Sequence, residues 1–214
     1  MLKLKALVTG FEKWGEELGN PTEILVNRLN GKSVDDIVIY GLLLPVSFNR
    51  AREKIVAKIR EMRPDIIINT GLAASRLVIS IERVAVNIID ARRPDNDGIR
   101  LIDEIIDPEG PFAYPSTLPT RKILDRLKSS GIPARLSYSA GTYLCNFVMY
   151  LSLRTVDKLR INSLAGFIHV PHTPDLAAKK DKPAPSMSIE LMEKAIKIGL
   201  EESATHLSKI RGQR

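Results

Sequence analysis

The stretch Ile37–Gly71, IVIYGLLLPVSFNRAREKIVAKIREMRPDIIINTG, decides the fold class. It begins with an apolar run that reaches Leu44 and ends with a second apolar run, 65–70. Between these runs, apolar side chains recur at helical spacing, at Phe48, Ala51, Ile55, Ile59 and Met62. Pro64 ends the helix, because the residue before a proline avoids the helical conformation. A strand, a helix and a strand in this order indicate a crossover unit and a parallel sheet.

The same alternation continues on both sides of this stretch. We expect strands at 3–10, 134–139 and 164–170, and a long extended segment at 77–89. Helices are expected at 21–29, 120–130, 144–159 and 188–210, the first of them capped by Asn20. The segments 90–119 and 171–185 are predicted to be irregular, the first with hairpin elements. The sequence therefore predicts one α/β domain over residues 1–214, a three-layer αβα sandwich with a mostly parallel, mixed central sheet.

Composition narrows the class of protein. A chain of 214 residues with 44% hydrophobic residues can bury one substantial core. Its longest apolar run is well short of the roughly 20 residues of a membrane helix, and its N-terminus lacks the pattern of a secretion signal. The single cysteine excludes an internal disulfide and favours the cytoplasm. The formal charge is +7, but basic and acidic residues are interleaved, so we expect neither a nucleic-acid nor a membrane partner.

That single cysteine, Cys145, lies where a predicted strand passes into a predicted helix. The unpaired N–H groups and the dipole of a helix start favour an anion, which would lower the pKa of the thiol and activate it. The same N–H groups could bind the oxyanion of a tetrahedral intermediate. The alternative is that Cys145, beside Leu144 and Phe147, is a small buried apolar residue.

Partners for a nucleophilic thiol are few, because the chain holds only three histidines. His169 ends an apolar strand, and active sites gather at the carboxyl ends of parallel strands, so it is the candidate base. His172 lies in the following loop and could be an ordinary solvated or hydrogen-bonded side chain. We expect His206, on the terminal helix, to be exposed. Glu82 interrupts an apolar run and could orient the imidazole. Alternatively, Glu82 pairs locally with Arg83 or Arg76 at the surface.

The chain resembles the pyrrolidone carboxyl peptidase family, also called pyroglutamyl peptidase I. The motifs that carry the resemblance are TGFEKWG at 9–15, NP at 20–21, GLA at 71–73 with IERVAVN at 81–87, DARRPDN at 90–96, STLP at 116–119, AGTYLCN at 140–146, GFIHVP at 166–171 and PSM at 185–187. The resemblance implies a cysteine exopeptidase that releases 5-oxoproline from the N-terminus of peptides through a thioester acyl-enzyme. It maps the catalytic triad onto Cys145, His169 and Glu82, without a metal or cofactor.

The resemblance also implies a substrate site and an assembly. Main-chain N–H groups of Arg92 and Cys145 correspond to the oxyanion hole. Substrate-binding positions are Phe11, Trp14, Asn20, Leu72, Tyr143 and Leu144. Apolar walls suit pyroglutamate, a neutral lactam without an ammonium group. For Phe11 and Trp14, the alternative is plain packing against the core. Family members commonly form homotetramers.

Two other functions fit parts of the sequence. A basic α/β module could bind RNA through Arg92-Arg93 and the cluster at 179–182, with a steep dependence on salt. A nucleoside phosphorylase or hydrolase could share the architecture, since a fold does not determine function. It would need a phosphate or ribose site, and no glycine-rich phosphate loop of known spacing occurs in the sequence.

Overall fold

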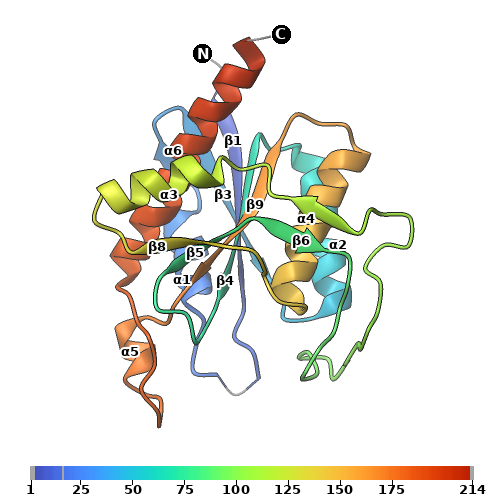
Figure 1. Ribbon diagram of the computed structural model, residues 1–214, viewed down its shortest axis with the longest axis vertical. Coiled ribbons are helices and arrows are strands. Elements are labelled where there is room, and N and C mark those ends of the chain that lie inside the picture. The colour runs from blue at the N-terminus through green and yellow to red at the C-terminus, as the bar shows by residue number, and fades with distance from the viewer. Residues whose placement is uncertain (1–2, 16, 213–214) are drawn as a thin grey trace.

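A seven-stranded sheet forms the centre of the computed structural model, which describes residues 3–15 and 17–212 (Figure 1). The strand order is β2-β3-β1-β4-β9-β5-β8. These strands are β1 (Leu4–Phe11), β2 (Ser33–Val34), β3 (Ile37–Leu44), β4 (Ile66–Leu72), β5 (Ile79–Glu82), β8 (Ala134–Ser137) and β9 (Leu164–Val170). All neighbours are parallel except β2 with β3 and β5 with β9. The sheet is therefore mixed and mostly parallel, as predicted.

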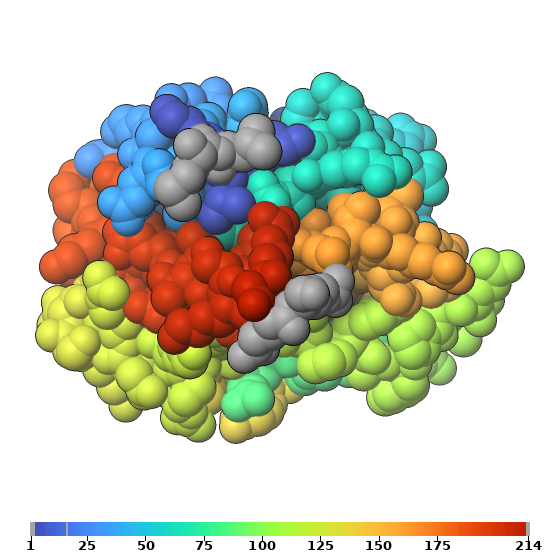
Figure 2. All heavy atoms as spheres, turned by 90° about the horizontal axis from the view of Figure 1, so that it is seen from above, coloured from blue at the N-terminus to red at the C-terminus, as the bar shows by residue number. Residues whose placement is uncertain are grey.

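Helices cover both faces of this sheet. They are α1 (Pro21–Leu29), α2 (Phe48–Met62), α3 (Thr120–Ser129), α4 (Leu144–Lys158), α5 (Pro174–Ala177) and α6 (Ile189–Gly212). One buried cluster packs α1, α3 and α6 on one face, and a second packs α2 and α4 on the other. Seen from above, α6 in red lies on the opposite side from α2 in cyan and α4 in orange (Figure 2). The predicted three-layer sandwich is confirmed.

The predicted extended segment at 77–89 is not one strand. It divides at Arg83: β5 joins the main sheet, whereas β6 (Val84–Val86) pairs with β7 (Ala113–Pro115) in a separate two-stranded sheet. The physical reason is an exchange of partners at Arg83, whose N–H donates to Ser137 O and whose carbonyl accepts from Ser116 N. The predicted hairpin elements within 90–119 include β7, and the segment 171–185 contains the short helix α5.

Strand alternation places the candidate site residues on one face of the sheet. Ile67 of β4 and Phe167 of β9 pack against α2 and α4. Gly71 lies four residues after Ile67 and His169 two residues after Phe167, so both face the same side. Gly71 and His169 are also paired across the two strands, near their carboxyl ends. The candidate base therefore faces the layer that contains α4.

A buried polar network fixes α4 on this face. Asn69 of β4 donates to Ser152 Oγ of α4 at 3.2 Å and to Gly166 O of β9 at 3.0 Å. Its Oδ1 accepts from Thr9 Oγ1 of β1 at 2.9 Å. Buried polar groups with satisfied partners specify one packing arrangement, so this network sets the position of α4 along three strands. Across the residues that the structure describes, no helix is long and apolar enough to cross a membrane.

Candidate active site

The thiol of Cys145 lies at the start of α4 and directly above β4. The helix begins at Leu144, and its N-cap residue is Tyr143. The side chain of Tyr143 accepts no hydrogen bond from the N–H groups of the first turn. Cys145 is partly buried. A Cβ atom built on Gly71 would lie 2.8 Å from Sγ of Cys145. Because the strand carries a glycine there, the sulfur can approach the backbone next to His169.

His169 and Glu82 form a buried pair beside this thiol. Nδ1 of His169 lies 2.8 Å from Oε1 of Glu82, and the two residues are 4% and 0% exposed. The carboxylate oxygen also accepts a hydrogen bond from Nη1 of Arg76. Nη2 of Arg76 donates to Ser139 O at 2.8 Å, in the segment between β8 and α4 that leads to Cys145.

Both sequence interpretations of Glu82 therefore hold in part. Its carboxylate contacts His169, and its local partner is Arg76. Arg83, the other local candidate, instead places its guanidinium 5.8 Å from the ring centroid of Tyr138. The Arg76 pair is not a surface pair, since the Glu82 side chain is fully buried. Arg76 thus belongs to the candidate site, where the sequence indicated only a competing ion pair.

The charges of this group are set by burial and by one another. Burial raises the pKa of Glu82, but contacts with His169, Ser137 and Arg76 outweigh it, so the net shift is downward. Burial lowers the pKa of His169, and the charge of Arg76 adds to this effect; together they outweigh the opposite effect of Glu82. At neutral pH the pair is therefore an ionised carboxylate and a neutral imidazole.

The predicted lowering of the thiol pKa is wrong. Burial raises the pKa of Cys145 to about 12, and the negative charge of Glu82 contributes in the same direction. Arg76 opposes these effects without overcoming them. The physical reason is that desolvation and a nearby carboxylate outweigh the helix start. Cys145 is therefore a neutral thiol at neutral pH, and attack by its sulfur would require a base.

A cavity of about 170 Å³ opens in front of the thiol. It gathers every predicted substrate-binding residue with the predicted nucleophile: Phe11, Trp14, Asn20, Leu72, Tyr143, Leu144 and Cys145. Four further residues complete its lining, namely Glu17, Gly19, Val46 and Ala74. Val46 follows β3 and Ala74 follows β4. The only sequence signal for these two residues was their position just beyond the carboxyl end of a parallel strand, where active sites gather. The walls are largely apolar.

Two aromatic walls of the cavity are held by one carbonyl group. Pro94 O accepts from Nε1 of Trp14 at 3.3 Å and from Oη of Tyr143 at 3.1 Å. The two rings are tilted, with centroids 5.6 Å apart, and Phe48 packs edge-on against Tyr143. Burial, aided by Asp95 and Cys145, raises the pKa of Tyr143 to about 12, so the phenol stays neutral. Trp14 thus lines the cavity as well as packing against the fold.

Asn20 lines the cavity, but its polar atoms serve the fold. Its Oδ1 accepts from Thr22 N at 3.0 Å and from Thr22 Oγ1 at 2.8 Å, which caps α1 as predicted. Its Nδ2 donates to Glu12 O at 3.1 Å. Asn20 therefore shapes the loop after β1 through both its amide oxygen and its amide nitrogen.

The remaining predicted residues are placed as follows. Arg92 is exposed in the segment after β6, which hydrogen-bonds to the start of α4 through Asp90 and Thr142. His172 is buried rather than solvated, and its Nδ1 has no partner among the described residues. His206 is half-buried beside a surface groove, not exposed. The described part of the chain contains no cluster of three or more His, Cys, Asp or Glu residues suited to a metal.

Comparison with known proteins identifies relatives over nearly the full chain. A family model described as pyroglutamyl peptidase matches residues 4–206. The pyrrolidone-carboxylate peptidase of Thermococcus litoralis is 46% identical over 211 residues, covering 97% of this chain and 96% of its own. That of Pyrococcus furiosus is 46% identical over 207 residues, covering 95% and 100%. The solved pyrrolidone carboxyl peptidase from Thermococcus litoralis superimposes with a TM-score of 0.94 at 46% identity, covering 96% of both chains.

Proposed function

The chain belongs to the pyroglutamyl peptidase family of cysteine peptidases, and from this premise we propose that it hydrolyses the bond after an N-terminal pyroglutamyl residue of peptides. Cys145 is the proposed nucleophile, His169 the base and Glu82 the group that orients the imidazole. The observation that carries the proposal is the position of the thiol: it lies at an uncapped helix start, over the glycine that pairs with His169, which contacts Glu82.

The proposed reaction passes through a thioester. Sγ of Cys145 bonds to the pyroglutamyl carbonyl carbon while its proton moves to Nε2 of His169. The C–N bond then breaks, and the leaving amine takes that proton, which leaves the pyroglutamyl group on the sulfur. His169 next removes a proton from water, which attacks the thioester, releases 5-oxoproline and restores the thiol. The original Cys145 proton thus leaves with the amine, and the proton that His169 takes from water passes to the sulfur and restores the thiol.

The tautomer of His169 supports this assignment. An ionised carboxylate can only accept hydrogen bonds, so we assign the imidazole proton to Nδ1, 2.8 Å from Oε1 of Glu82. Nε2 then carries the free lone pair that a general base requires. The lowered pKa of His169 keeps this nitrogen unprotonated at neutral pH. A neutral thiol beside a neutral imidazole can transfer its proton as the sulfur attacks, so no thiolate is needed in the resting state.

The oxyanion of the tetrahedral intermediate needs donors at the helix start. We assign this role to the main-chain N–H groups of Cys145 and Arg92. Tyr143 leaves the first turn of α4 without a side-chain cap, which favours an external acceptor there. Such donors each contribute about 10² to 10³ in kcat in other enzymes.

The cavity suits a small, neutral ring. Its volume of about 170 Å³ is below the range of roughly 300 Å³ or more that drug-sized ligands occupy. Phe11, Trp14 and Leu72 offer apolar surface, and the one acidic lining residue, Glu17, is paired with Lys180. A free ammonium group would find no unpaired carboxylate among these lining residues. The lactam of pyroglutamate has no such group, which favours it over prolyl or alanyl termini.

A substrate panel tests the proposal. The protein should release a chromogenic amine from a pyroglutamyl amide and not from prolyl, glutaminyl or alanyl amides. Cys145→Ala and Cys145→Ser should abolish this release while the circular dichroism spectrum and melting temperature stay close to those of the parent. His206→Gln is the matched control, because His206 lies outside the cavity. Release by Cys145→Ala, or equal cleavage of all four amides, would contradict the proposal.

We also propose a cytoplasmic homotetramer. The location rests on the single unpaired cysteine. Subunit contacts are supported by large apolar side chains exposed in one loop, with Ile102 at 55%, Ile105 at 61% and Phe112 at 79%. Light scattering should give about four times the mass of one chain, and Phe112→Glu should lower it. A monomer at micromolar concentration would contradict the tetramer without affecting the proposed chemistry.

A further inference from the structure

Asn146 follows the nucleophile in the first turn of α4 and bonds away from its own helix. It is 1% exposed. Its Oδ1 accepts from Val86 N at 2.9 Å, and its Nδ2 donates to Val86 O at 2.8 Å and Ile88 O at 3.1 Å. Both amide hydrogens and the carbonyl oxygen are therefore engaged with the main chain of one segment. This side chain clamps the start of α4 to β6 and the residues after it.

The clamped segment leads directly to the second proposed oxyanion donor. Arg92 lies four residues after Ile88 on the same segment. Between them, Asp90 N donates to Thr142 O at 2.9 Å, and Thr142 Oγ1 donates to Asp90 O at 2.9 Å. Tyr143 Oη donates a further hydrogen bond to Pro94 O at 3.1 Å. The two segments that carry the Cys145 and Arg92 N–H groups are thus hydrogen-bonded to each other, and the Asn146 bonds lie at one end of this contact.

We propose that Asn146 is a positioning residue for the hydrolysis: it sets the spacing between the Cys145 and Arg92 main-chain N–H groups, so that both can reach one oxyanion. The inference rests on the proposed function. Hydrogen bonds weaken steeply once geometry departs from about 2.7–3.2 Å. A donor pair on two separate segments keeps that geometry only if the segments cannot slide. Loss of the clamp should therefore affect the transition state and spare binding of the lactam ring.

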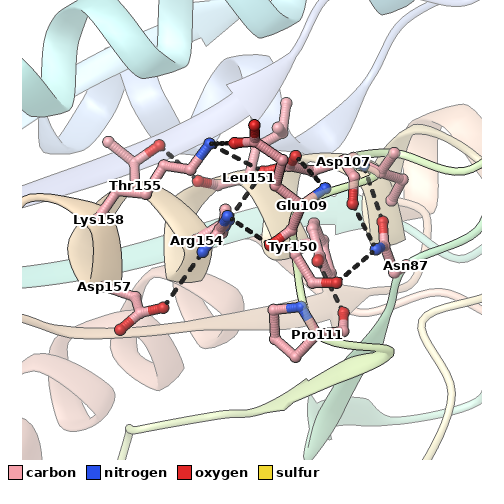
Figure 3. Close-up of polar contacts among 12 residues, drawn as sticks. Asn87, Asp107, Glu109, Pro111, Tyr150, Leu151, Arg154, Thr155, Asp157 and Lys158 are labelled. Atoms are coloured by element: carbon pink, nitrogen blue, oxygen red, sulfur yellow. Dashed lines mark hydrogen bonds and ion pairs between the residues drawn. The ribbon is translucent and has the colours of Figure 1, made fainter.

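The chain provides a matched control for this clamp. Asn87 lies on the same segment and is 7% exposed, and its side-chain amide also hydrogen-bonds to main-chain groups. Its Nδ2 donates to Asp107 O at 2.8 Å, and its Oδ1 accepts from Asp107 N at 2.9 Å. Figure 3 shows Asn87 beside Asp107, in the network around Arg154. Asn87 therefore fastens the segment to a neighbouring loop, whereas Asn146 fastens it to the nucleophile helix.

The experiment compares Asn146→Ala and Asn146→Asp with Asn87→Ala and Asn87→Asp. Four quantities are measured: kcat and KM on a pyroglutamyl amide, and the inhibition constants of 2-pyrrolidone and of the aldehyde of pyroglutamic acid. The pyrrolidone probes ring binding alone. The aldehyde adds the Cys145 thiol across its C=O bond, and the hemithioacetal oxygen then occupies the oxyanion position. Affinity for the aldehyde therefore reports the donors, as kcat does.

We expect the Asn146 variants to lose about 10- to 100-fold in kcat, part of the effect of one oxyanion donor. The aldehyde inhibition constant should rise by the same factor, while KM and the pyrrolidone constant stay within about threefold. Asn87 variants should lose comparable thermal stability and keep kcat. Equal kinetic losses in both pairs, or pyrrolidone binding lost in parallel with kcat, would overturn the inference.

Thr142→Val is a second variant, for use if the Asn146 variants fail to fold. It removes the Oγ1 bond to Asp90 O and nearly preserves side-chain shape. It should show the same pattern with a smaller kcat loss, and an unchanged kcat would overturn the inference. A parent protein with no pyroglutamyl amidase activity would instead refute the proposed function, so the two failures are distinguishable.

Discussion

Gly71 of β4 leaves room for the sulfur of Cys145. A methyl group built on Gly71 would stand 2.8 Å from Sγ of Cys145 and 2.7 Å from Cζ of Phe167. Both distances are shorter than Cβ contacts in folded proteins, so both neighbours or the strand itself must shift. Gly71 is also the strand partner of His169. A glycine therefore occupies the strand position that lies next to both the proposed nucleophile and the proposed base.

Gly71→Ala should displace the thiol and inactivate the enzyme. We expect kcat/KM to fall by about 100-fold or more, since misplacement by 1 Å can cost that much, and unfolding free energy to fall by about 1–3 kcal/mol from overpacking. Gly166→Ala is the control, because its Cβ would meet Ser116 Oγ at 2.4 Å, away from the cavity. It should destabilise similarly and retain kcat/KM for the folded fraction. Equal kcat/KM in both variants would contradict this role of Gly71.

The pH dependence of activity should follow His169. Burial and Arg76 hold its pKa below the ordinary 6.5, so the neutral, basic form persists below that pH. The acid limb of kcat/KM should therefore lie below pH 6.5. Alkylation of Cys145 by iodoacetamide should accelerate with rising pH from 7 to 10, because burial and Glu82 raise the thiol pKa to about 12. A high, constant alkylation rate between pH 5 and 7 would indicate a resting thiolate and contradict this picture.

The same thiol should make stability sensitive to alkali. Because the folded pKa of Cys145 is raised from 9.0 to about 12, its contribution is fully present below pH 9 and is lost between pH 9 and 12. The parent should therefore lose stability relative to Cys145→Ala as the pH rises, by about 1 kcal/mol at pH 10. Urea unfolding of both proteins at pH 7 and pH 10 measures this difference. A constant difference would show that the thiol pKa is not raised.

Sequence periodicity predicted most of the fold because the central strands are long and apolar. The limits of 37–44 and 164–170 agree with β3 and β9, and α1 begins at the predicted cap, Asn20. The division of 77–89 was not predictable from periodicity, because both halves have strand-like composition. What separates them is pairing at Arg83 with residues far along the chain, Ser116 and Ser137.

Family resemblance predicted the residues that line the cavity, but from the residues alone the candidate site was predictable only where residue type carried chemistry. Cys145, His169 and Glu82 stood out as a thiol, an imidazole and a carboxylate in apolar settings. Asn146 and Gly71 gave no comparable signal, since their roles depend on contacts with Val86 and with the sulfur. The thiol pKa was predicted with the wrong sign for a similar reason. A helix start is visible in sequence, whereas burial and the proximity of Glu82 appear only in three dimensions.

Removing the Trp14 wall should weaken binding of the ring. Trp14→Ala deletes a cavity wall and the bond to Pro94 O, and we expect KM and the pyrrolidone inhibition constant to rise by about tenfold or more. Tyr143→Phe is the matched control: it keeps the ring and loses only the hydroxyl bond to the same carbonyl. Its KM should change by less than about threefold. Unchanged pyrrolidone affinity in Trp14→Ala would exclude this residue from the ring site.

An ion-pair network behind the site should govern stability in acid. Asp107 accepts from Nε of Arg154 at 2.7 Å and from Lys158 at 3.1 Å, which joins the loop after β6 to α4 (Figure 3). These contacts, first among them the Arg154 bond, lower the pKa of Asp107 from 3.8 to about 2. The stability that they provide is therefore present above pH 3.8 and is lost as the pH falls toward 2.

Asp107→Asn should thus cost about 1–2 kcal/mol of unfolding free energy at pH 7 and much less near pH 2. The new amide places a donor against the Arg154 guanidinium, yet it retains an oxygen for Glu109 N, so the loop itself stays capped. Glu61→Gln is the control, because the Lys58–Glu61 pair is exposed and should contribute less than about 0.5 kcal/mol. Urea titrations at pH 7 and pH 2.5 compare the three proteins. The helix α4 carries Cys145 at its other end. Retained kcat in Asp107→Asn would therefore show that the network stabilises α4 without setting the position of the thiol. A loss of kcat beyond about threefold would contradict this conclusion.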